Sequence, residues 1–124
     1  MALTMTRTRT QKALTHLAKA VAAAHGELEL LDAIVPLLPD SSEALERRRS
    51  HLLADRDALY LTLRQFDAEL DGGDIGTSPD WLKAYGPGNK RRLALAAYLE
   101  ALGIPPLTPA VFERVWRDAR ALCR

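Results

Sequence analysis

The sequence predicts an all-α protein, and composition and periodicity both indicate that class. Of the 124 residues, 20 are Ala and 22 are Leu, two of the strongest helix formers. Four Val and three Ile are few for a β-sheet protein, because strands favour β-branched side chains. Apolar residues also recur at helical spacing over two long stretches. We therefore expect a long antiparallel helical hairpin, similar to a coiled coil, followed by a compact unit of three short helices.

Length and charge narrow the class of protein further. A chain of this size forms one domain, so residues 1–124 are expected to fold as a single domain. The formal net charge of +1 excludes a strongly polycationic or polyanionic protein. The single cysteine, Cys123, cannot form an intrachain disulfide, which excludes disulfide-stapled secreted proteins. No apolar run approaches the ~18–20 residues of a membrane span, so we expect a cytoplasmic protein without membrane contact.

The first long helix is expected to begin near residue 10. Residues 1–9 alternate Thr with Arg and have no helical period, so we expect a frayed start. Gly26 costs about 1 kcal/mol relative to Ala in a helix, which leaves the continuity of the helix open there. Pro36 and Pro39 end the helix because proline lacks the N–H that a helix interior needs. The apolar positions follow a/d heptad spacing: Leu14, Leu17, Val21, Ala24, Leu28, Leu31, Val35 and Leu38.

A second long helix is expected after the prolines. Asp40 and Glu43 have capping-box spacing and predict its N-terminus, and Gly72 with Gly73 predicts its end. Its apolar residues repeat every seven positions, at Leu45, Leu52, Leu59 and Phe66. Because a short connection favours antiparallel neighbours, residues 10–71 are expected to form a helical hairpin.

The charge pattern supports a register for this hairpin. Net charge alternates in blocks of +4, −6, +3 and −5 over residues 1–25, 26–46, 47–65 and 66–80. A turn near residues 39–40 sets blocks of opposite sign side by side. It places Asp32 beside Arg47, and Glu29 beside Arg48 or Arg49. Exposed ion pairs contribute only ~0–1 kcal/mol each, so the pattern indicates register rather than stability.

The remaining chain predicts a linker over 72–78 and a small basic helical unit over 79–124. Ser78 and Pro79 begin a helix to Tyr85, and further helices are expected over 90–102 and 109–123. The helix over 90–102 is apolar nearly all round, Leu93 included, and is expected to be buried. Gly103 and Ile104 fit a helix C-cap with its hydrophobic contact.

Residues that carry out chemistry are sparse. His16 and His51 lie outside the apolar stripes and are expected to face solvent. Asp71 and Asp74 flank two glycines, which is typical of a turn after a helix. The sequence has neither an HExxH motif nor a nucleophile with a base beside it. We therefore expect no enzyme, no metal site, no cofactor and no small-molecule substrate.

Clustered cations are the strongest candidate for a contact site. Lys90, Arg91 and Arg92 open a helix after a glycine-rich turn, where free N–H groups and cations can hold a phosphate or carboxylate. These side chains could instead point outward or pair with Asp74 or Asp80. The last helix adds Arg114, Arg117, Arg120 and Arg124. Residues 81–124 carry +5 in total, so contact with nucleic acid is possible.

The sequence therefore supports two alternative functions. The first is a non-enzymatic helical module that interacts with a protein partner or assembles with itself through the hairpin, as a homodimer. The alternative is a nucleic-acid-binding accessory protein that uses the basic C-terminal unit. Residues 1–26 contain four cations and no acidic residue, a composition shared with organellar transit peptides. Because the heptad of the first helix begins within this segment, we favour a structural role for it.

Overall fold

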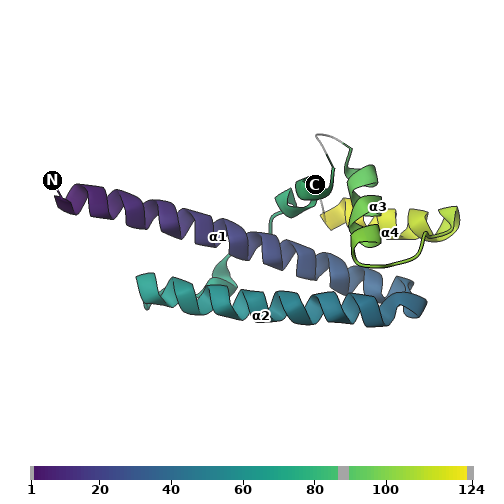
Figure 1. Cartoon of the computed structure of the whole chain (residues 1–124), viewed down its shortest axis with the longest axis horizontal. Helices are drawn as coiled ribbons and strands as arrows, with labels where there is room; N and C mark the ends of the chain where they lie inside the picture. The colour runs from purple at the N-terminus through teal and green to yellow at the C-terminus, as the bar shows by residue number, and fades with distance from the viewer. Residues whose placement is uncertain (1, 87–89, 123–124) are drawn as a thin grey trace.

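The computed structural model describes residues 2–86 and 90–122, with side chains from residue 9 onward in these ranges. The elements in this part of the chain are helical, which confirms the all-α class. Two long helices, α1 (Ala2–Ile34) and α2 (Ser42–Phe66), lie side by side, and the shorter helices pack at one end of this pair (Figure 1).

The first helix is longer than the sequence suggested. It begins at Ala2, so the expectation of a frayed start over residues 1–9 is wrong for residues 2–9. That segment contains neither Gly nor Pro, and extending a formed helix by one residue is far easier than nucleating one. The helix also continues without interruption through Gly26.

Two short 3₁₀ turns, Val35–Leu37 and Pro39–Ser41, reverse the chain between the long helices. The expected capping box is wrong, because Ser41 is the N-cap residue of α2 and its side chain makes no capping hydrogen bond. The helix ends at Phe66, six residues before the glycines that were expected to stop it. Asp67 is extended, and its N–H donates to the Leu63 carbonyl.

The long helices contact each other along the predicted stripes. Leu45, Leu52 and Leu63 of α2 are buried, as are Val21, Leu28 and Leu31 of α1. The expected pairing of Asp32 with Arg47 is wrong by two residues, because Arg49 donates to Asp32 at 2.8 Å and Arg47 pairs with Glu43 on its own helix. The register was predicted from a turn near residues 39–40. The 3₁₀ turn Pro39–Ser41 delays the start of α2, which shifts the pairing.

The chain then forms a 3₁₀ turn η3 (Gly72–Asp74), a 3₁₀ helix η4 (Asp80–Tyr85) and the helices α3 (Arg91–Ala101) and α4 (Pro109–Leu122). We call η4, α3 and α4 the C-terminal unit. The end of α3 has the predicted glycine cap: Gly103 has φ +84°, its N–H donates to Glu100, and the N–H of Ile104 donates to Leu99. This is the Schellman pattern, and the side chain of Ile104 is buried beside it.

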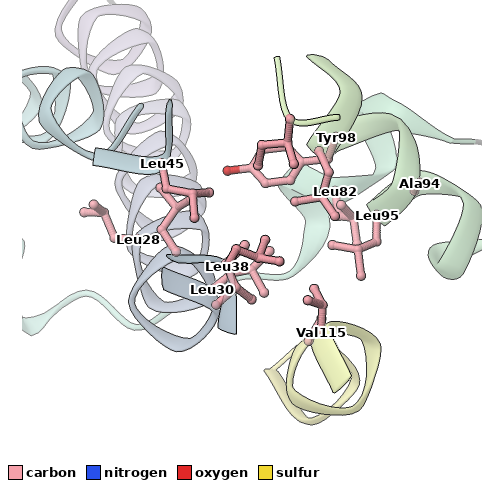
Figure 2. Packing of buried hydrophobic residues seen from close by; sticks show 14 of the residues in the cluster. Leu28, Leu30, Leu38, Leu45, Leu82, Ala94, Leu95, Tyr98 and Val115 are labelled. Atoms are coloured by element: carbon pink, nitrogen blue, oxygen red, sulfur yellow. The ribbon is translucent and has the colours of Figure 1, made fainter. Parts of the chain in front are cut away.

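The main core lies where the C-terminal unit packs on the hairpin. Figure 2 shows Leu30 and Leu45 of the hairpin on the side toward Leu82, Leu95 and Val115 of the C-terminal unit, with Leu28 farther from that unit. Leu93 contradicts the expected burial of the helix over 90–102, since its side chain is 63% exposed. One side of α3 packs against η4 and reaches the hairpin through the hydrogen bond from Tyr98 to Glu27, whereas Leu93 is exposed away from these contacts.

Candidate functional site

The hairpin has two halves that differ in what covers them. Its covered half, residues 21–34 of α1 with residues 42–53 of α2, carries the C-terminal unit. Its open half, residues 9–20 of α1 with residues 59–66 of α2, lies beyond the C-terminal unit, and the segment around Gly72 contacts it at Tyr60 (Figure 1). The candidate interaction surfaces are on the open half. They end where the C-terminal unit packs on the hairpin.

A buried polar network joins the C-terminal unit to both long helices. The Glu27 side chain of α1 is 5% exposed and accepts two hydrogen bonds from Arg48 of α2, at 2.6 and 2.9 Å. The hydroxyl of Tyr98 in α3 donates to the same carboxylate at 2.7 Å. The Tyr98 oxygen points toward the hairpin in Figure 2. A paired and hydrogen-bonded carboxylate tolerates burial that an isolated one does not.

This network shifts two pKa values upward. Burial, followed by the charge of Glu27, raises the pKa of the Tyr98 hydroxyl well above its ordinary value. The hydrogen bonds to Glu27 raise the pKa of the Arg48 guanidinium. Tyr98 also packs edge-on against Trp81 and Tyr85, with ring centroids 4.8 and 5.1 Å away. These contacts point to a structural role that fixes the three helices to one another.

The segment expected to be a linker is fastened across the hairpin. The ring of His25 bonds through Nδ1 to the Ile75 carbonyl at 2.8 Å, and its Nε2 contacts the Tyr60 hydroxyl. Gly72 lies against the ring of Tyr60 so closely that a Cβ there would overlap it. A carbonyl accepts hydrogen bonds, so Nδ1 carries the proton toward Ile75. The histidine therefore joins α1, α2 and the segment after α2.

Gly26 is explained by the same crossing. The N–H of Ser78 donates to the Ala22 carbonyl at 3.0 Å, which places residue 78 directly on the surface of α1. A Cβ on Gly26 would lie 2.2 Å from the Ser78 carbonyl oxygen and 3.0 Å from Trp81 Nε1. The glycine is needed for this close approach rather than for backbone freedom.

The predicted basic residues in the described part of the chain lie on the surface of the C-terminal unit. Arg92 forms an ion pair with Glu113 of α4, and its guanidinium lies 5.4 Å from the centre of the Phe112 ring. It therefore helps to hold α3 to α4. The remaining predicted residues in the described part of the chain are exposed: Lys90, Arg91, Arg114, Arg117 and Arg120. Arg124 and the turn over 87–89 lie outside the described residues.

Cations that the sequence analysis did not single out form a row on the open half of α1. The side chains of Arg9, Lys12, His16 and Lys19 are exposed and spaced by three, four and three residues. That spacing keeps them on one side of a helix. Lys12, His16 and Lys19 lie in the helix that the sequence predicted, so their spacing was visible there, and Arg9 joins the row because the helix begins at Ala2.

Apolar side chains are incompletely covered on the same half. Phe66 is 44% exposed, and Leu70 just beyond α2 is also exposed. Leu14 and Leu17 of α1 are half-buried. Leu63 beside them is 2% exposed, so the seam between the helices closes while its edges stay open. A two-helix seam of this kind leaves apolar surface for a further helix or hairpin to cover.

Comparison with known proteins adds no assignment to these surfaces. No family model, no curated protein and no solved structure matches the chain. Across residues 2–86 and 90–122, no group of three or more His, Cys, Asp and Glu side chains is placed to hold a metal ion. The helices in these ranges are also each too short or too polar to cross a bilayer.

Proposed function

We propose that the protein is a non-enzymatic helical interaction module that assembles with a second copy of itself through the open half of its hairpin. The supporting observation is the contrast between the covered half, with its closed core, and the open half, where Phe66 and Leu70 are exposed. Packing two open halves together forms a four-helix arrangement that buries these edges. A partner protein with an amphipathic helix is the other occupant that this surface fits.

The experiment compares two apolar residues of α2 that face different directions. Phe66 lies at the edge of the seam, whereas Leu61, which is 63% exposed, lies five residues away on the outer side. We expect light scattering at micromolar concentration to give a dimer mass for the unaltered protein. Phe66→Glu gives a monomer, because it places a charge in the interface. Leu61→Glu is the matched control and leaves the dimer intact.

Two results would contradict this proposal. A monomer mass for the unaltered protein at concentrations up to about 100 μM removes self-association as the function. A dimer that survives Phe66→Glu but is lost on Leu61→Glu moves the interface to the outer side of α2. Circular dichroism of both variants checks that the helices remain folded, so loss of the dimer is not confused with loss of the fold.

A further inference from the structure

The row of cations on α1 continues a stripe that the C-terminal unit covers. Steps of three and four residues lead from Lys19 through Ala23 to the buried face of α1, which is formed by Glu27, Leu30 and Ile34. Glu27 binds Tyr98 of α3, and Leu30 and Ile34 belong to the core shared with α4. The four basic positions therefore lie on the side of the hairpin that carries the C-terminal unit, immediately beyond it.

The C-terminal unit presents more cations on its own surface. Figure 1 shows α4 running back so that its C-terminal end is the end nearer the N-terminal half of α1. Arg117 and Arg120 are exposed near that end. Asp118 is the acidic side chain exposed between them, so the end of α4 keeps a positive balance. The end of α4 is therefore a second basic region, separate from the row on α1.

In the described part of the chain, the row on α1 lacks an ion-pair partner on its own helix, while the acidic residues Asp67, Glu69 and Asp71 follow the end of α2. The sequence has no acidic residue before Glu27, whose carboxylate is buried and bound to Arg48. Among the described side chains, the ion pairs engage other residues than Arg9, Lys12 and Lys19. Cations clustered on one face raise the local concentration of anions and accelerate their association.

The chemistry of the surrounding side chains narrows the class of anion. A shallow depression is lined by Gln11 and Thr15 together with the basic residues Lys12, His16 and Lys19, which adds hydrogen-bonding groups to the charges. Residues 9–20 contain no Phe, Tyr or Trp, so His16 is their one ring on which a base of a single strand could stack. The basic face also lacks the large apolar residues with which amphipathic helices enter a lipid surface. Duplex phosphates need neither feature.

We propose that Arg9, Lys12, His16 and Lys19 bind the phosphodiester backbone of duplex nucleic acid, and that Arg117 and Arg120 provide a second, separate contact. The row runs from Arg9 to Lys19, which is about 15 Å of helix. A duplex carries one phosphate per ~1.7 Å of its axis, so several phosphates lie within reach. The contact is independent of base sequence, because it reads charge and not base edges. It does not depend on self-association of the hairpin.

The test is a titration of the full chain with a fluorescent 20-base-pair DNA duplex of mixed sequence at several salt concentrations. We expect micromolar or weaker binding that decreases with salt. The variant Lys12→Gln/Lys19→Gln weakens binding roughly tenfold or more at low salt and lowers the slope of log K against log salt by about 1 for each lost contact. The matched control, Arg47→Gln/Lys83→Gln, removes the same charge from exposed ion pairs elsewhere and changes binding less than twofold.

Several outcomes would overturn the proposal. Equal losses in the two double variants show that net charge, and not the row on α1, determines binding. Absence of binding at 20 mM salt excludes a duplex partner outright. Tighter binding to vesicles of anionic lipid than to the duplex replaces the nucleic acid with a membrane surface. Light scattering on each variant checks the oligomeric state, so a loss of DNA binding is distinguishable from a loss of assembly.

Discussion

The covered and open halves of the hairpin share one apolar pattern and have different surroundings. In the covered half, Leu30, Leu31 and Ile34 are fully buried because η4, α3 and α4 form a third layer. In the open half, Leu14 and Leu17 lie on the same heptad stripe as Leu31 and remain half-buried. The heptad therefore indicates which residues face the other long helix, and the third layer adds residues off that stripe, Leu30 and Ile34, to the core.

The comparison predicts very different costs for the same substitution. We expect Leu30→Ala to lower the free energy of unfolding by about 3–4 kcal/mol, because it leaves a cavity in a closed core. Leu17→Ala in the open half should cost about 1 kcal/mol, since less surface is buried there. Urea unfolding followed by circular dichroism measures both values, at a concentration where the chain is monomeric. Equal costs would show that the two halves are not distinct.

The polar network should produce the next largest effect. Arg48→Ala leaves the Glu27 carboxylate buried without its cation, and we expect a loss of about 3 kcal/mol. Arg47→Ala is the neighbouring control; it removes a pair with Glu43 that is mostly exposed, and should cost less than about 0.5 kcal/mol. The same urea titration reports both variants. Similar values for the two would mean that Glu27 relaxes to solvent when Arg48 is removed.

A substitution of Gly26, which lies where the segment around residue 78 crosses α1, should lower the stability of the protein. Gly26→Ala removes a helix-breaking residue, which alone would gain about 1 kcal/mol. The new Cβ instead collides with the Ser78 backbone, so we expect a net loss of about 1–2 kcal/mol. Gly76→Ala is the control, because its Cβ would meet nothing within 4 Å. Thermal unfolding of both proteins gives the answer, and a stabilised Gly26→Ala variant would contradict the observed crossing.

The smallest predicted effect is an alkaline one. Since folding raises the pKa of Tyr98, the unfolded chain loses this proton first, and stability falls above about pH 10. Between pH 9 and pH 11 the unaltered protein should lose about 1.4 kcal/mol more than Tyr98→Phe, which has no proton to lose. Parallel losses in both proteins would show that other groups, and not Tyr98, cause the alkaline destabilisation.

Local rules predicted the elements of this fold well. The proline-bounded turn, the stripe through Leu45 and Leu52, and the glycine cap at Gly103 each depend on residues close together in sequence. Leu93 shows the limit of composition, because an apolar helix surface indicates burial without showing which side is covered.

The candidate site was predictable only in part. Glu27 has the sequence pattern of a surface acid, and its burial depends on Tyr98, which lies 71 residues away along the chain. His25 is likewise fixed by Ile75 and Tyr60 across the hairpin. Arg92, which was predicted to belong to an anion site, forms an ion pair with Glu113 on another helix. Most of the row on α1 could have been found from periodicity, because Lys12, His16 and Lys19 lie within the helix that the sequence predicted.

The crossing of α1 by residue 78 has a consequence for folding kinetics. The hairpin can form early, since its turn joins helices that follow each other directly in the chain. The hydrogen bond from Ser78 to Ala22 closes a much longer loop, and such closure carries an entropic cost that increases with loop length. We expect docking of this segment to follow hairpin formation, so that substitutions at Gly26 slow folding less than they accelerate unfolding. During synthesis, the surface of α1 around Ala22 would therefore lack its contact with residue 78 until more than half of the chain has left the ribosome.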